Sequence, residues 1–192
     1  AAVDPLGTRV AVGIAADGRL MSESVSRRLE LRELADDQAT LTALEDIEAS
    51  QAHGLSQSQL IDVLNDDARC VLGAWWQACE SSGGEASTAE LIGFVVLARG
   101  PFEAEIEAIT VHAAQRGQGV GARLLAAAIA QARDWQRDSG LERLLLEVRA
   151  SNAAAAALYA KAGFTRDGVR KGYYPLADGG REDAWLMSLP LV

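Results

Sequence analysis

The chain has 192 residues, of which 49% are hydrophobic, and a formal charge of −9 from 18 basic and 27 acidic residues. This length fits one domain that buries its own core, and no run approaches the ~18 apolar residues of a membrane-spanning helix. The acidic balance argues against a nucleic-acid-binding protein, which needs a basic surface; it suits a cationic substrate, and solubility alone explains it equally well.

The first 26 residues are predicted to form an N-terminal extension to a single domain that covers residues 27–192. Within the extension, residues 9–15 and 19–25 flank Asp17-Gly18, a pair that favours the turn of a β-hairpin. Residues 28–34 then alternate apolar and charged side chains, as a half-buried strand does.

Two helices are predicted next. Asp36 or Asp37 can cap the first, and the second begins near Ser56. Apolar residues recur at helical spacing in both, at Leu41, Leu44 and Ile47 and then at Leu60, Ile61 and Leu64.

Three strands are predicted over residues 68–77, 90–99 and 103–111. The first two are separated by a polar, glycine-rich run at 81–88, which we interpret as an exposed hairpin loop rather than a domain linker. In the third strand the apolar residues change parity between Ile106 and Ile109. That change indicates a β-bulge near residues 108–110, or else a strand end that is buried on both faces.

The C-terminal half alternates helices and strands. A helix over 120–137 ends at Gly140, and residues 141–148 form a nearly continuous apolar run, typical of a buried parallel strand. Ser151 or Asn152 can cap an alanine-rich helix that stops at Gly163, and two strands follow at 164–173 and 181–189. The fold class is therefore predicted as α/β (α+β), a mixed central sheet with helices on both faces.

Cysteine and histidine usage indicates no metal site. Cys70 and Cys79 are too few for a disulfide framework, so we expect two reduced thiols. His53 and His112 lie far apart and beside no cysteine pair, so no zinc-binding spacing is present.

The first thirty residues lack a basic start followed by an apolar run, so we expect no secretory signal and a cytoplasmic location.

A glycine-rich turn at residues 115–122 precedes the 120–137 helix. Its glycines let the backbone turn its N–H groups toward a ligand, and the helix N-terminus adds positive charge, so the segment can bind an anion such as a pyrophosphate. It lacks the Gly-Lys-Ser/Thr ending of a P-loop, and the spacing to Glu142 or Glu147 does not by itself establish a dinucleotide fold.

The pattern Arg-x-x-Gly-x-Gly at Arg116, Gly119 and Gly121 resembles the pyrophosphate loop of the GNAT N-acetyltransferases. Residues 146–152, 157–159 with 163–164, 173–175 and 182–187 resemble the RimI branch of that family, which acetylates the N-terminal alanine of a small-subunit ribosomal protein. The resemblance is dense over 103–190. It implies a GNAT fold and acetyl-CoA as co-substrate, held by Ile109, Thr110, Val111, Arg116, Gly117, Gln118, Gly119, Val120, Gly121, Ala122 and Asn152.

One segment departs from the RimI pattern. Where RimI proteins carry Phe-Pro-Trp-Ser after the first helix, this chain has His53-Gly54-Leu55-Ser56. Because that region shapes the acceptor site, the departure favours a second interpretation, a GNAT enzyme that acetylates a small-molecule amine. A third interpretation is a CoA-sensing protein without turnover, against which Glu147 and Tyr159 argue.

Glu147 is the candidate general base. A peptide α-amine has a pKa of about 7.7–8.0, against roughly 10.4 for lysine, so one carboxylate is adequate to deprotonate it. Glu147 interrupts an apolar strand, where an unpaired charge is costly, and the matching family residue is the base. The alternative is an edge carboxylate that is paired with Arg149 or Arg143.

Tyr159 is the candidate general acid toward the departing thiolate, since it matches the family's acid; alternatively it packs on Phe164.

Tyr173 and Tyr174 are predicted to form the acceptor wall, or else to be core residues of a strand. Three glutamates at 103, 105 and 107 are predicted to form a solvated strand face, and a less favoured interpretation has them meet basic residues of a peptide.

The sequence thus predicts an acetyl-CoA-dependent N-terminal alanine acetyltransferase without a metal. Its partner is the N-terminus of a small-subunit ribosomal protein. We expect no direct contact with nucleic acid or membrane, and a monomer or weak homodimer.

Overall fold

The computed structural model describes residues 9–14, 20–51, 54–79 and 89–191, with residues 9–26 and 78–79 described by their backbone alone. The elements, in chain order, are β1 (Arg9–Ile14), β2 (Leu20–Glu33), α1 (Gln38–Ala49), α2 (Gln57–Leu64), β3 (Arg69–Cys79), β4 (Glu90–Arg99), β5 (Glu103–Val111), a 3₁₀ turn (Ala113–Gln115), α3 (Val120–Ser139), β6 (Arg143–Arg149), α4 (Ala153–Lys161), β7 (Thr165–Pro175) and β8 (Arg181–Pro190).

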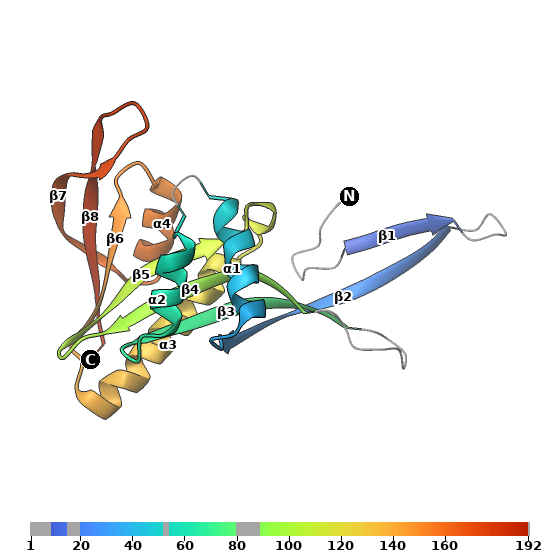
Figure 1. Cartoon of the computed structure of the whole chain (residues 1–192), viewed down its shortest axis with the longest axis horizontal. Helices are drawn as coiled ribbons and strands as arrows, with labels where there is room; N and C mark the ends of the chain where they lie inside the picture. The colour runs from blue at the N-terminus through green and yellow to red at the C-terminus, as the bar shows by residue number, and fades with distance from the viewer. Residues whose placement is uncertain (1–8, 15–19, 52–53, 80–88, 192) are drawn as a thin grey trace.

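The strands form one mixed sheet in the order β1-β2-β3-β4-β5-β6-β8-β7, in which only the β5–β6 pair is parallel among the described strands. β1 pairs with β2 over residues 20–25, whereas β3 pairs with β2 over 26–33, so β2 runs on past residue 26 into the main sheet. The β1–β2 ribbon projects away from the helices (Figure 1). The expected hairpin turn at 15–19 and the run at 81–88 lie outside the described residues.

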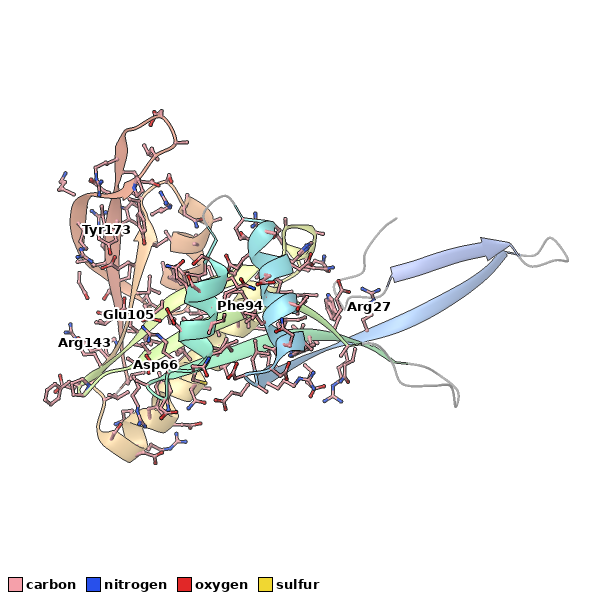
Figure 2. All side chains as sticks on the ribbon, viewed as in Figure 1. Arg27, Asp66, Phe94, Glu105, Arg143 and Tyr173 are labelled. Atoms are coloured by element: carbon pink, nitrogen blue, oxygen red, sulfur yellow. The ribbon has the colours of Figure 1, made fainter. Side chains whose placement is uncertain are left out.

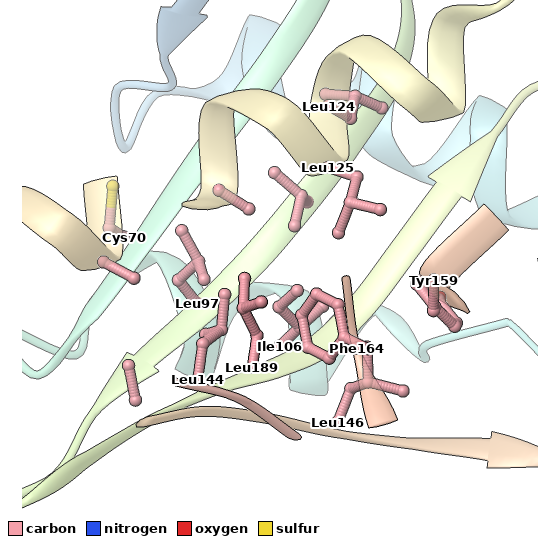
Figure 3. Packing of buried hydrophobic residues seen from close by; sticks show 14 of the residues in the cluster. Cys70, Leu97, Ile106, Leu124, Leu125, Leu144, Leu146, Tyr159, Phe164 and Leu189 are labelled. Carbon is pink, nitrogen blue, oxygen red and sulfur yellow. The ribbon is translucent and has the colours of Figure 1, made fainter. Parts of the chain in front are cut away.

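Helices cover both faces of the sheet, as the pattern predicted. On one face α1 and α2 pack Leu44, Ile47 and Leu60 against Phe94 and neighbouring strand residues. On the other face α3 and α4 enclose the larger core, which includes Leu124, Leu125, Leu144, Leu146 and Phe164 (Figure 3). Burying aliphatic side chains on both faces contributes about 1.5–3 kcal/mol for each fully buried side chain and fixes the sheet between the helices.

The helix ends lie where the sequence placed them. Asp37 caps α1 by accepting a hydrogen bond from the Thr40 backbone N–H at 2.7 Å, and Ser56 caps α2. α3 ends at Gly140, whose φ of 73° lies in the left-handed region that glycine adopts readily. Of the apolar residues of α2, only Leu60 is buried, and Ile61 is 41% exposed.

The predicted β-bulge is present, one residue earlier than expected. Val96 of β4 pairs with Ala108 and Leu97 pairs with Ile106, so Glu107 is the extra residue. The insertion returns Ile109 and Val111 to the same core as Ile106, which explains the change of parity in the sequence. The strand end is therefore bulged rather than buried on both faces.

β5 and β6 diverge just beyond this point. Their parallel pairing ends at Ile106–Leu146, after which β5 continues along β4 and β6 continues along β8 (Figure 1). The backbone of residues 109–111 therefore has no strand partner on its β6 side. This opening in the sheet positions the candidate site.

Cys70 is a free, buried thiol whose pKa is raised to about 12, first by burial and then by the nearby Glu33. The side chain of Cys79 lies outside the described part of the chain. No helix in the described ranges combines the length and apolarity needed to cross a bilayer.

Candidate functional site

A cavity of about 840 Å³ occupies the opening between β5 and β6. Its walls are the end of β5, the glycine-rich turn, the start of α3 and one face of α4. The predicted residues that line it are Ile109, Thr110, Val111, Arg116, Gly117, Gly119, Val120, Gly121, Asn152 and Tyr159. We call this space the donor cavity.

The glycine-rich turn presents an uncapped helix N-terminus to the donor cavity. Gly117 and Gly119 have φ angles of 75° and 79°, which side chains with a Cβ rarely adopt. Gly119 is also the N-cap of α3 and offers no side-chain hydrogen bond, so the first N–H groups of the helix remain available to a ligand. The geometry suits a phosphate or pyrophosphate group.

Arg116 is anchored at the side of this turn. Its Nε donates to the Val111 carbonyl at 3.3 Å, and its Nη2 donates to the Gln51 side chain. The two bonds hold a positive charge next to the end of β5 and the helix N-terminus, which favours an anionic ligand.

Two predicted donor residues lie outside the lining of the donor cavity. Gln118 donates from its side-chain amide to the Gln115 side chain at 3.2 Å and to the Ala114 carbonyl at 3.4 Å, so it stabilises the turn itself. Ala122 is exposed on α3. Conversely, the cavity is also lined by Glu48, Ser50 and Gln51 from the end of α1, which no motif in the sequence marks.

Tyr159 joins the donor cavity to the core. Its ring is 9% exposed and lies 6.0 Å from the Phe164 ring, so the packing alternative holds together with a position on the cavity wall. Burial, and secondarily the negative charge that Tyr174 would carry, raises the pKa of Tyr159 to about 12. The phenol therefore stays protonated and can donate a hydrogen bond or a proton.

Asn152 also combines two roles. Its side chain caps α4 by accepting a hydrogen bond from the Ala155 N–H at 3.1 Å, and it lines the donor cavity.

A second cavity of about 420 Å³ lies on the other side of the opening. Its lining includes Leu55 and Gln59 from the α1–α2 region, Glu105 and Glu107 from β5, Glu147 from β6 and Tyr173 and Tyr174 from β7. Figure 2 marks the positions of Glu105 and Tyr173 on their strands. We call this space the acceptor cavity.

Glu147 does not have the ion-pair partner expected of it. Its Oε1 accepts a hydrogen bond from Arg170 Nη1 at 2.5 Å. Arg143 is instead paired with Glu103, and Arg149 is paired with Glu182 at 2.6 Å. The alternative of a carboxylate paired with Arg143 or Arg149 therefore names the wrong partners, although Glu147 is ion-paired, because β7 lies near enough for Arg170 to reach it.

The two tyrosines form a wall of the acceptor cavity and are not core residues. Tyr173 is 39% exposed, and its ring meets that of Tyr174 edge-on at 5.0 Å. An arginine also stacks on each ring. The guanidinium carbon of Arg170 lies 4.1 Å from the centre of the Tyr173 ring, and that of Arg149 lies 4.3 Å from the centre of the Tyr174 ring. The wall is thus held rigid by charged neighbours.

Tyr174 lines the acceptor cavity. Burial and then the charge of Glu147 raise the pKa of Tyr174, and the charge that Tyr174 would carry contributes to the raised pKa of Tyr159. Both cavities lie along β5, the acceptor cavity at residues 105–107 and the donor cavity at residues 109–111.

The β5 glutamates form a partly ion-paired face. Glu107 accepts from Arg69 at 2.7 Å, and Glu103 pairs with Arg143. The pKa of Glu105 is raised by partial desolvation and by the charges of Glu147 and Glu107, and Arg170 opposes that rise.

The segment that departs from the RimI pattern is bound to α1. The buried Glu48 accepts through Oε2 from the Leu55 backbone N–H at 2.8 Å. A Cβ added to Gly54 would lie 2.4 Å from Glu48 Oε2 and 2.8 Å from the Glu48 carbonyl oxygen. Glycine is therefore required at this approach, and Leu55 reaches the acceptor cavity as a result.

Residues 32–164 match the acetyltransferase (GNAT) family. Over 89 residues the chain is 46% identical to the ribosomal protein bS18-alanine N-acetyltransferase of Escherichia coli K12. It is 42% identical, also over 89 residues, to the Haemophilus ducreyi protein of the same name. These alignments cover 46% of the chain in each case, and 57% and 59% of the two relatives.

Among solved structures, the crystal structure of the E. coli ribosomal-protein-S18-alanine N-acetyltransferase superposes with a TM-score of 0.68 at 30% identity. That superposition covers 85% of this chain and 94% of the other. The family match extends from the end of β2 through α4 and includes the glycine-rich turn, so it covers the elements that build the donor cavity, whereas β7, which carries Tyr173 and Tyr174 of the acceptor cavity, follows it in the chain. The chain therefore belongs to the GNAT acetyltransferase family.

Proposed function

We propose that this protein transfers the acetyl group of acetyl-CoA to the N-terminal α-amine of a protein, with the N-terminal alanine of a small-subunit ribosomal protein as acceptor. One observation carries the proposal: two separate cavities follow β5, one lined by Tyr159 and an anion-binding turn, the other lined by Glu147. We place the reacting groups at a junction of the two cavities, between Glu147 and Tyr159. The likeness to the bS18-alanine N-acetyltransferases supports the choice of acceptor. We propose that the reaction takes place in the cytoplasm.

The donor cavity has the features that acetyl-CoA needs. The turn at Gly117–Gly119 and the first N–H groups of α3 would hold the pyrophosphate, and the unpaired backbone of 109–111 would pair with the amide groups of the pantetheine arm. When bound, acetyl-CoA supplies an acetyl group activated as a thioester.

The residues at the junction would manage the protons. Glu147, directly or through a water, takes the proton from the attacking α-amine, a bond forms between that nitrogen and the acetyl carbon, and the bond from that carbon to sulfur breaks. Tyr159 then protonates the departing thiolate. Since the α-amine loses its proton near pH 8 and the pKa of Tyr159 is about 12, a neutral amine and a protonated phenol coexist between these values.

The proposal is tested by thiol release from acetyl-CoA with peptides that begin with alanine, beside a panel of amino sugars and polyamines. We expect release with the peptides, and the same peptide with a blocked N-terminus is the control. Preferred turnover of a free amine would favour the small-molecule alternative. Acetyl-CoA binding without release on any acceptor would contradict catalysis.

Gly119→Ala is expected to weaken acetyl-CoA binding by about tenfold. Nothing lies within 4 Å of the added Cβ, so the effect comes from the positive φ alone, which costs alanine roughly 1–2 kcal/mol. Gly140→Ala is the matched control, because Gly140 also has a left-handed φ (73°) and open space around an added Cβ, but it ends α3 and does not line the donor cavity. Calorimetric titration measures both, and equal affinities for the two variants would contradict the role of the turn.

A further inference from the structure

Arg170 connects the proposed base to the acceptor wall. Its Nη1 donates to Glu147 Oε1 at 2.5 Å, and its guanidinium carbon lies 4.1 Å from the centre of the Tyr173 ring. The Glu147 side chain is 19% exposed and the Arg170 side chain 49%, so the carboxylate is partly shielded from water while the guanidinium stays open to it. One side chain thereby touches both the carboxylate and the aromatic ring.

An irregularity in β7 follows directly after Arg170 and places Tyr173. Arg170 pairs with Ala184 and Tyr174 pairs with Glu182, so the three residues 171–173 of β7 face the single residue Asp183 of β8. This extra length lets β7 bend at the acceptor cavity instead of continuing as a regular strand.

Polar contacts from β8 stabilise the bulge. Gly172, whose φ is 54°, donates its backbone N–H to Asp183 Oδ1 at 2.8 Å. Arg181 donates to the carbonyls of Gly172 and Tyr173, the latter at 2.8 Å. Because these groups hold the bulge from the opposite strand, the position of Arg170 beside Glu147 is preset by the fold.

We propose that Arg170 is a positioning residue that holds the Glu147 carboxylate oriented toward the acceptor amine. The inference rests on the proposed function and extends it to the residue that prepares the base. Arg170 occupies Oε1 of Glu147 and leaves Oε2 to receive the proton.

The charges around Arg170 make its contribution specific. It faces Glu147 on β6, Glu105 on β5 and Tyr173 on its own strand. The nearby Arg69 is bonded to Glu107 and Asp66. Without Arg170, the negative charges of Glu105 and Glu147 would face each other unbalanced, and the already raised pKa of Glu105 would rise further.

The test compares Arg170→Gln and Arg170→Lys in the full chain. For Arg170→Gln we expect kcat to fall by roughly 10- to 100-fold, the acceptor KM to rise, and the Kd of acetyl-CoA to stay unchanged. The acid limb of kcat/KM is expected to move to higher pH by about half a unit to one unit. The amine titrates identically with every variant, so a shift between variants comes from the enzyme. Arg170→Lys keeps the charge, so it should restore the acid limb and part of kcat.

Arg166→Gln is the matched control. Arg166 lies on the same strand, but its guanidinium stacks on Trp185 at 4.7 Å, whereas that of Arg170 bonds to Glu147 and stacks on Tyr173. We expect its kinetics and pH profile to match the wild type. In the Glu147→Gln background, Arg170→Gln should cause little further loss, because the two residues act as one unit.

A wild-type kcat and pH profile in Arg170→Gln, or a full additional loss in the Glu147→Gln background, would overturn this inference and leave the proposed function intact. A wild-type protein that acetylates no acceptor would overturn the proposed function, and the inference with it.

Discussion

Glu147→Gln is expected to lower the rate of acetyl transfer by about 10²- to 10⁴-fold while acetyl-CoA binds as it does to the wild type. Glutamine keeps the length of the side chain and an oxygen for Arg170, but it cannot take a proton from the amine. Binding should persist because Glu147 lines the acceptor cavity and does not line the donor cavity. Thiol release measures the rate, and calorimetric titration measures the affinity.

Glu107→Gln provides the matched control for this substitution. Glu107 lies on the same acceptor cavity, but its carboxylate is bonded to Arg69 rather than facing the junction with the donor cavity. Its rate should therefore fall by no more than a few fold. A Glu147→Gln protein with the wild-type rate would exclude Glu147 as the base.

Tyr159→Phe is expected to slow acetyl transfer by about 10²-fold with little change in stability or in acceptor KM. Phenylalanine preserves the ring that packs against Phe164 and removes only the hydroxyl group that would protonate the thiolate. Single-turnover measurement with acetyl-CoA and an alanine-initiated peptide separates this step from product release.

Two observations check the role of Tyr159. The wild-type rate should increase as the α-amine loses its proton near pH 8. Because the pKa of Tyr159 is raised to about 12, the phenol stays protonated up to about pH 10, and the rate should show no decrease in that range. Tyr173→Phe is the control, since that ring is exposed on the acceptor wall and stacks on Arg170 with or without its hydroxyl. Equal rates for Tyr159→Phe and wild type would remove Tyr159 from the mechanism.

Local patterns predicted most of the elements correctly because the physics that forms them is local. The caps at Asp37 and Ser56 and the stop at Gly140 depend on hydrogen bonds or dihedral angles within a few residues. The bulge was predicted from a parity change in the strand itself. Its position at Glu107, however, depends on the pairing with β4, which the pattern of β5 alone does not contain.

The partners of charged side chains were not predictable in the same way. The alternative interpretation of Glu147 paired it with Arg143 or Arg149, which are near it in sequence, but it pairs with Arg170, 23 residues further along the chain. The contribution of α1 to the donor cavity, through Glu48, Ser50 and Gln51, also has no local signal. Contacts of this kind are set by how β7 and α1 pack on the sheet.

The sequence by itself determined the order of helices and strands and the glycine turn that can bind an anion, and its resemblance to the GNAT family suggested the two residues proposed to move protons. The tertiary structure decided that β5 and β6 separate after Ile106 and Leu146, that Glu147 lines one cavity and Tyr159 the other, and that Arg170 reaches Glu147. Periodicity and caps arise from interactions between residues a few positions apart, whereas cavities and ion pairs arise where strands distant in sequence are brought together.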